Sequence, residues 1–534
     1  MPMHTSFDKL LRHLGFLVAL GLPASMAAPQ SSQADRPTLV VMLTIDQLRP
    51  DYLTLFEGQL TGGLGRLLRG GAVFLNAFQD HAITETAPGH ASVLSGRFPR
   101  STGIMSNSAG VYDPQSPLIG SRGEPASPFR FRGTGLADWL RFSNPRSQAL
   151  SVSRKDRGAI LPMGRAKQAV FWFAQSNGSF TTSRYYVDTL PSWVQAFNDR
   201  RLPHAFAGKA WDLLLDASEY PEPDSVSTES AGRDYAFPHR FPQDPAQTAA
   251  QIAGYPMMDQ LTLAFALEGV RQMKLGTGDG TDLLAVSLST TDAVGHRFGP
   301  DSREIHDQVL RLDQYLGAFL DTLYALRDSS RIVLALTSDH GVTPLPATRS
   351  RSPNQGAGWV NVLPAVIPLF ASLRAAGVDT SSFRFEDGVL YLEDTAISRA
   401  GLRSDAVVRA FSTELMKIRG VLRVDRVATL ASRDTSRDDI ARRWLHMLPP
   451  DLPAVAVVTL RPYWYWREWT YTTHGTPHDS DAAVPIIFYG AGIKPGRSDR
   501  RVLVVDIAPT LAAIADVRPL EVLDGRVLRE VIRP

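Results

Sequence analysis

The chain of 534 residues is long enough for a sizeable core, and its 44% hydrophobic and 21% charged residues are ordinary for a globular protein, which excludes a disordered or fibrous chain. Its formal net charge of +2 gives no electrostatic case for nucleic-acid binding. Cysteine is absent, so disulfides, thiolate ligands and cysteine nucleophiles are excluded, and any metal site must use His, Asp, Glu and hydroxyl oxygens.

Residues 1 to 28 have the pattern of a secretory signal peptide. Lys9 and Arg12 precede an apolar run at 14 to 22, and small residues follow at 24 to 28. The run is shorter than the ~20 residues that span a bilayer, so we do not expect a membrane anchor. We expect cleavage near Ala27 or Ala28 and a protein exported to the periplasm or the medium.

The first predicted strand is the nearly unbroken apolar run T-L-V-V-M-L-T-I, which ends at Asp46. Such a run is typical of a strand buried on both faces. A carboxylate at the carboxyl end of this strand would lie where open α/β sheets bind their ligands. A loop aspartate or a helix cap before Pro50 is an equally good interpretation of Asp46 from this segment alone.

A helix over 52 to 70 and a strand over 72 to 78 are expected next, followed by a helix over 86 to 97 that begins at Thr86, just before Pro88. Free backbone N–H groups and the helix dipole make a helix start a site for phosphate. Thr86 is therefore a candidate nucleophile. Taken alone, the segment favours an ordinary N-cap threonine.

Three more strands are expected at 281 to 289, 331 to 341 and 484 to 490, with a long helical pattern reaching about Arg327. Strands that alternate with helices predict an α/β fold, a doubly wound, mostly parallel sheet with helices on both faces. We expect one catalytic domain over 37 to 534, with insertions at about 108 to 245 and 345 to 470 that cap the carboxyl edge of the sheet. The aromatic stretches W-V-N-V and R-P-Y-W-Y-W-R-E-W fit a binding groove, but core packing is the favoured interpretation.

Carboxylates and histidines follow the predicted strands. Asp46, Thr86, Asp292 with His296, and Asp339 with His340 come after four strands, and His474 precedes the strand at 484. Each pair is weak evidence, because chance spacing would produce about one such pair in a chain of this composition. Convergence at one edge of one sheet is stronger evidence, since ligands bind there.

In this order, I-D-Q-L-R-P-D, T-E-T-A-P-G-H-A-S, T-D-A-V-G-H-R-F-G-P, S-D-H-G and H-G-T-P-H-D-S-D resemble the motifs of the alkaline phosphatase superfamily, in its threonine-nucleophile branch. The resemblance runs from about residue 38 to the C-terminal region. It implies two zinc ions. One would be bound by Asp292, His296 and His474, and the other by Asp46, Asp339, His340 and the Thr86 oxygen. His478 stands where relatives often have tyrosine, and its role stays open.

The segment S-V-S-R-K-D-R-G contains Lys155 and Arg157, which would project to one side of an extended backbone. A solvated basic loop is the usual fate of such a triplet. The segment is nevertheless similar to the phosphate clamp of the phosphate-irrepressible alkaline phosphatases, and Asn107 matches the amide that contacts a phosphoryl oxygen in that branch. Diesterase relatives typically show F-P-N-H where this chain has A-P-G-H. These features favour monoesters over diesters.

The predicted function is thus an exported, zinc-dependent phosphomonoesterase that acts on small phosphate esters through a phosphothreonine on Thr86. Asn107, Lys155 and Arg157 would stabilise the phosphoryl oxygens. One alternative is a phosphodiesterase or nucleotide pyrophosphatase on the same di-zinc core, and another is a non-catalytic, zinc-stabilised binding protein. The sequence does not define the oligomeric state, for which a monomer is the simplest expectation.

Overall fold

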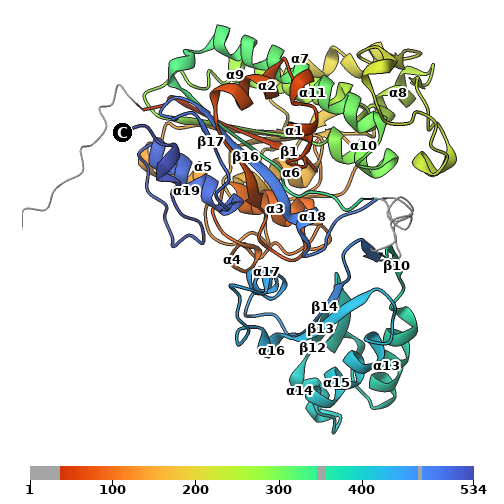
Figure 1. The fold of residues 1–534 in the computed structure, drawn as a ribbon. Helices are drawn as coiled ribbons and strands as arrows, with labels where there is room; N and C mark the ends of the chain where they lie inside the picture. The colour runs from red at the N-terminus through yellow and green to blue at the C-terminus, as the bar shows by residue number, and fades with distance from the viewer. Residues whose placement is uncertain (1–35, 345–355, 467–471) are drawn as a thin grey trace, which may run out of the picture.

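The computed structural model describes residues 36 to 344, 356 to 466 and 472 to 534, which form two lobes (Figure 1). The expected signal peptide lies outside the described residues. The larger lobe holds the central sheet and both ends of the described chain, and the smaller lobe comes from the interval between 356 and 466 (Figure 1). None of the helices in these ranges is both long and apolar enough to span a bilayer.

Ten strands of the described chain form the central sheet, in the order β17-β2-β16-β9-β1-β8-β3-β4-β5, with β18 beside β2. Five consecutive neighbours, from β9 to β4, are mutually parallel. Strand β16 is antiparallel to both β2 and β9, and β5 is antiparallel to β4. The prediction of a mostly parallel sheet is therefore confirmed. The strands are β1 Leu39–Ile45, β2 Ala72–Phe78, β3 Ala149–Ser153, β4 Ala169–Ala174, β5 Ser179–Thr181, β8 Asp282–Leu288, β9 Ile332–Thr337, β16 Ala483–Gly490, β17 Gly496–Ser498 and β18 Val502–Leu503.

Helices cover both faces of this sheet. Every residue of β1 is therefore buried, and its alternate side chains enter opposite layers. Val41 and Leu43 pack with α2, α9 and α11, whereas Val40 and Met42 pack with α3, α5 and α19. The layered arrangement is the one expected from the apolar runs. The helices are α2 Gly63–Gly70, α3 Thr86–Val93, α5 Leu136–Ser143, α9 Met257–Gln272, α11 Arg303–Leu326 and α19 Ile507–Ile514.

Two expectations about element boundaries were wrong. The interval 108 to 245 is not only a cap, because it supplies β3, β4 and β5 of the central sheet. The helix expected over 52 to 70 is interrupted between α1 Tyr52–Leu55 and α2, where Gly62 and Gly63 lie against α11. A Cβ on Gly62 would stand 2.4 Å from the carbonyl oxygen of Asp313, so this contact requires glycine.

The smaller lobe is built on a four-stranded antiparallel sheet, ordered β11-β12-β14-β13, with its own hydrophobic core. A separate parallel pair, β10 with β15, lies between this sheet and the larger lobe (Figure 1). The aromatic stretches divide between the two expected roles: Trp464 and Tyr465 are buried, whereas Trp466 lines a cavity. The elements are β10 Gly358–Val360, α13 Leu363–Ala375, β11 Phe383–Glu386, β12 Val389–Leu392, α14 Asp394–Arg399, α15 Ser404–Leu415, β13 Val421–Arg426, α16 Val427–Leu430, α17 Asp439–Met447, β14 Ala454–Leu460 and β15 Trp464–Trp466.

Strand direction explains why distant segments meet at one edge. The parallel strands β1, β8 and β9 all end at this edge, which is where Asp46, Asp292 and Asp339 follow them. Because β16 is antiparallel to β9, its beginning lies at the same edge. His474, which precedes β16, is thereby placed beside residues that follow the other strands.

Candidate metal centre and phosphate site

Thr86 is the first residue of α3, and only 1% of it is exposed. Glu85, not Thr86, occupies the N-cap position, and α3 has no side-chain cap from that residue. The N-cap interpretation of Thr86 is therefore wrong. Its Oγ1 instead lies 3.2 Å from Nζ of Lys155. The threonine hydroxyl thus faces a cation at the start of a helix, the arrangement that suits a nucleophile directed at phosphate.

One group of potential ligands is formed by Asp292, His296 and His474, whose ligand atoms lie within 4.8 Å of one another. Oδ1 of Asp292 is 3.1 Å from Nε2 of His296 and 3.7 Å from Nε2 of His474. Asp292 and His296 share one face of α10 Thr290–Phe298 because they are four residues apart. The structure thus brings together the three residues that the sequence analysis assigned to the first ion.

The second group contains Asp46, Asp292 and His340, again within 4.8 Å. Nε2 of His340 is 3.4 Å from Oδ1 of Asp46 and 3.5 Å from Oδ2 of Asp339. Burial would lower the pKa of His340, but the Asp339 and Asp46 carboxylates outweigh it and raise that pKa to about 9. The buried carboxylates therefore favour positive charge at this point.

The three histidines present the same ring nitrogen to the carboxylates. Nδ1 of His296 is 2.8 Å from the carbonyl oxygen of Thr472, and Nδ1 of His474 is 2.8 Å from that of Thr84. Nδ1 of His340 is 2.9 Å from the carbonyl oxygen of Gly341. A carbonyl oxygen only accepts, so each Nδ1 carries a hydrogen, and Nε2 is the nitrogen that each ring can offer to a metal ion.

The donor set fits divalent metal ions. Asp46 Oδ1 and His340 Nε2 are buried and form no hydrogen bond with the described residues. Carboxylate oxygens and imidazole nitrogens that converge in a buried place need a positive charge between them, either a proton or a metal ion. Imidazole nitrogens with carboxylate oxygens form a ligand set that zinc accepts.

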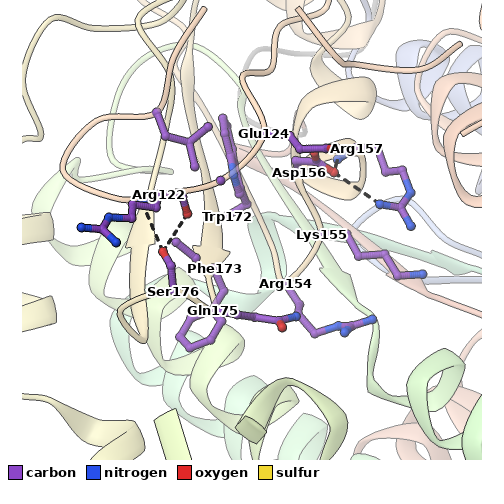
Figure 2. Close-up of a pocket in the computed structure, with 13 residues that line it drawn as sticks. Arg122, Glu124, Arg154, Lys155, Asp156, Arg157, Trp172, Phe173, Gln175 and Ser176 are labelled. Carbon is purple, nitrogen blue, oxygen red and sulfur yellow. Dashed lines mark hydrogen bonds and ion pairs between the residues drawn. The ribbon is translucent and has the colours of Figure 1, made fainter. Parts of the chain in front are cut away.

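Lys155 lies among the ligand carboxylates. Its Nζ is 2.6 Å from Oδ2 of Asp46 and 2.7 Å from Oδ2 of Asp292. The backbone around it differs from the expected extended strand, because Lys155 is the N-cap residue of α6 Asp156–Ile160 and Arg157 lies in the first turn. Figure 2 shows Arg154, Lys155 and Arg157 extending to the same side, away from Trp172 and Ser176. Lys155 and Arg157 thus project to one side as expected, but they do so from a helix start and not from an extended backbone.

Asn107 contacts the start of α3, where Thr86 lies. Its Oδ1 accepts a hydrogen bond from the backbone N–H of Ala87 at 2.9 Å, and its own backbone N–H donates to Oε2 of Glu85 at 2.7 Å. With the amide oxygen engaged, the NH₂ group remains as a donor. Asn107, Thr86, Lys155 and Arg157 all line one cavity of about 920 Å³.

Sequence reasoning missed a buried hydrogen-bond network behind these groups. Nδ1 of His90 is 2.9 Å from the carbonyl oxygen of Thr86 and 3.2 Å from Oδ2 of Asp339. Nε2 of His90 is 2.9 Å from Oγ of Ser287, which is 3.2 Å from Oγ of Ser153. Ser153 Oγ in turn accepts from the backbone N–H of Lys155 at 3.1 Å. The network connects the nucleophile, a ligand carboxylate and the clamp.

Gln47 and Gly89 were also missed. Gln47 donates from its backbone to Oδ1 of Asp339 at 3.2 Å and from Nε2 to Oδ1 of Asp292 at 3.1 Å. Its φ of 66° is unusual for a residue other than glycine and marks strain at this site. A Cβ on Gly89 would stand 2.2 Å from the carbonyl oxygen of Asp339, so α3 approaches that ligand closely. The glycine of the motif A-P-G-H permits this contact, which the sequence pattern alone does not reveal.

His478 does not join the metal ligands. Its Nε2 lies 2.8 Å from the carbonyl oxygen of Leu460, and the residue precedes α18 Asp479–Ala482. It therefore connects the last motif to β14 of the smaller lobe.

Comparisons of the sequence and the structure with known proteins agree on the family to which the chain belongs. Residues 40 to 480 match the family model of type I phosphodiesterases/nucleotide pyrophosphatases. The chain is 31% identical to alkaline phosphatase PhoV of Synechococcus elongatus, over 93% of each chain. It is 28% identical to alkaline phosphatase PafA of Elizabethkingia meningoseptica, over 97% of this chain and 98% of PafA. The crystal structure of PafA superimposes with a TM-score of 0.85, covering 95% of this chain and all 100% of that one. The chain therefore belongs to the type I phosphodiesterase/nucleotide pyrophosphatase family and, within the alkaline phosphatase superfamily, to the alkaline phosphatases of the threonine-nucleophile branch.

Proposed function

We propose that this alkaline phosphatase hydrolyses phosphate monoesters through a covalent phosphothreonine on Thr86, and that it binds two zinc ions. The observation that carries the proposal is the position of the Thr86 hydroxyl, 3.2 Å from Nζ of Lys155 and in one cavity with Asn107 and Arg157. A monoester has three terminal oxygens that need charge stabilisation, whereas a diester has fewer and adds a second organic group. Two cations and an amide suit the monoester.

In the first step Thr86 Oγ1 attacks phosphorus, and its bond to phosphorus forms as the ester P–O bond breaks. The hydroxyl proton passes to solvent, and the leaving oxygen takes a proton from solvent and departs as an alcohol. Bound ions would supply Lewis acidity that lowers the pKa of the Thr86 hydroxyl and neutralises the leaving oxygen. Lys155, Arg157 and the Asn107 NH₂ group stabilise the equatorial oxygens. In the second step the oxygen of a water molecule replaces Oγ1, which regenerates Thr86 and releases inorganic phosphate.

We propose for the two ions the ligand sets that the family resemblance implies. Asp292, His296 and His474 would hold one ion, and Asp46, Asp339, His340 and the Thr86 oxygen would hold the other, with Asp292 close to both groups. We further propose that the protein acts after export to the periplasm or the medium, as the pattern of residues 1 to 28 suggests. Its substrates are small phosphate esters in this proposal.

Trapping the phosphorylated protein tests the proposal. The unsubstituted protein, mixed with excess monoester and quenched in acid, should carry one phosphoryl group on the peptide that contains Thr86, as detected by mass spectrometry. Thr86→Ala should lose both the modification and nearly all turnover while retaining bound metal. Thr54→Ala, a matched change at an exposed helical threonine, should behave as the unsubstituted protein. Full turnover by Thr86→Ala, or phosphorylation elsewhere, would contradict the mechanism, and bound metal without turnover of any ester would favour a binding protein.

A further inference from the structure

The cavity that contains Thr86 extends to the smaller lobe. Its volume of about 920 Å³ exceeds the space that a phosphoryl group needs, and its far wall is built by three segments of that lobe. These segments are the stretch at 360 to 363, from the end of β10 to the first residue of α13, the turn between β11 and β12 at 385 to 388, and the end of β15 at Trp466. A leaving group bonded to a phosphoryl group at Thr86 therefore has this wall to contact.

The greater part of the wall is apolar and aromatic. Val360, Val362 and Leu363 line it from β10 and the start of α13. The rings of Phe385 and Trp466 lie 6.0 Å apart at an angle of 72°, an edge-to-face contact that fixes both rings. Ile83 lines the cavity from the larger lobe. Such a surface binds apolar or ring-shaped groups by removing them from water.

The turn between β11 and β12 adds carboxylates to this wall. Glu386 pairs with Val389 at the end of the hairpin, so Asp387 and Gly388 are the two central residues of a tight turn. Their φ values of 49° and 78° are both positive, as a type I′ turn requires. This turn type matches the twist of the strands, so the acidic tip is held in one conformation.

A hydrogen bond fastens the acidic tip beside the phosphate site. Oγ of Ser108 donates to Oε1 of Glu386 at 3.0 Å, and Ser108 follows Asn107 directly. The other oxygen of Glu386 is 3.7 Å from Nε of Arg384, but both side chains are about half exposed, so water screens that pair. The cavity thus carries charge of both signs. Lys155 and Arg157 line it from the larger lobe, and Glu386 and Asp387 line it from the smaller lobe.

We propose that this wall determines which leaving groups the enzyme accepts, an inference that rests on the proposed phosphomonoesterase function. The favoured substrates are monoesters whose leaving group is apolar or aromatic and is uncharged or cationic. A leaving group with a second anionic group, such as a carboxylate or another phosphate, is disfavoured because it approaches Glu386 and Asp387. The smaller lobe is then a specificity element, and the metal centre is common to all substrates.

The charge component is tested with phenyl phosphate and 4-carboxyphenyl phosphate. Glu386→Gln removes the charge and keeps an oxygen that can accept from Ser108. We expect the ratio of kcat/KM for the carboxylated substrate to kcat/KM for phenyl phosphate to rise about three- to fivefold in this variant, the size of a partly exposed charge interaction. Glu393→Gln, the same change at an exposed position of the same lobe, should alter neither substrate.

The apolar component is tested with phenyl phosphate and ethyl phosphate. Trp466→Leu should lower kcat/KM for phenyl phosphate about tenfold relative to ethyl phosphate, since it removes most of the aromatic surface. If the unsubstituted protein hydrolyses none of these monoesters, the proposed function fails. If it hydrolyses them and both variants leave the substrate ratios unchanged, the inference about the wall is overturned while the function stands.

Discussion

Nδ1 of His90 lies 3.2 Å from Oδ2 of Asp339, in a place where neither side chain is exposed. Nδ1 is also 2.9 Å from the carbonyl oxygen of Thr86. The donors of the network run in one direction, from the backbone of Lys155 through Ser153 and Ser287 to Nε2 of His90. In this direction Nε2 of His90 accepts and Nδ1 donates, so His90 holds a ligand carboxylate and the nucleophile in fixed positions.

Replacing His90 should therefore weaken metal binding. We expect His90→Phe, which keeps a ring but loses both nitrogens, to lower metal affinity about 10- to 100-fold, the usual effect of losing a group that orients a ligand. Titration against a competing chelator measures this. Ser287→Ala leaves Nδ1 paired with Asp339 and should have a smaller effect. Equal affinities in His90→Phe and the unsubstituted protein would show that the network does not support the metal centre.

Two substitutions at Asn107 should separate its two hydrogen bonds. Asn107→Asp keeps an oxygen for the Ala87 N–H but replaces the NH₂ donor with a negative oxygen, so kcat/KM should fall at least about 100-fold while stability is nearly unchanged. Asn107→Ala loses donor and acceptor, so it should lose activity and also about 1 kcal/mol of stability. Steady-state kinetics and urea unfolding distinguish the two. An active Asn107→Asp variant would exclude the amide from phosphoryl contact.

Lys155 should matter most to stability when metal is absent. Removing its ammonium group leaves Asp46 and Asp292 without their cation partner, which costs on the order of 3 kcal/mol for a buried ion pair. We therefore expect Lys155→Ala to unfold at much lower urea concentration than the unsubstituted protein after chelation. With saturating zinc the difference should be small. The same difference under both conditions would mean that Lys155 and metal do not share these carboxylates.

Glu229 should make stability fall toward alkaline pH. It is buried, and burial together with the Glu304 and Asp224 charges raises its pKa to about 9. The folded state therefore keeps a proton that the unfolded state releases near pH 4.5, so stability decreases from that pH until the pH passes about 9. Urea unfolding of Glu229→Gln should show an advantage over the unsubstituted protein that grows across this range and is constant above it. An advantage independent of pH would contradict the raised pKa.

The strands were predictable because β1, β8 and β9 are buried on both faces and appear as unbroken apolar runs. The metal ligands were predictable for a related reason, since they follow those runs directly. The break between α1 and α2 was not, because it depends on Gly62 and Gly63 meeting α11, which is some 250 residues away in the chain.

The interval from 108 to 245 concealed β3 and β4 for a similar reason. Both strands are short, and only their pairing with β8 and with each other shows that they belong to the central sheet. The network of His90, Ser287 and Ser153 joins three elements whose sequence spacing has no pattern. The wall of the smaller lobe likewise depends on how that lobe meets the larger one.

The most direct test of the account compares kcat/KM for an aryl phosphate monoester with that for its methyl diester, which has the same leaving group, before and after Lys155→Ala combined with Arg157→Ala. Metal content is measured alongside, because Lys155 contacts the ligand carboxylates. We expect the monoester to be preferred by at least about 100-fold and the preference to collapse in the double variant at equal metal content. A preference for the diester, or a monoester preference that survives both substitutions, would contradict the account.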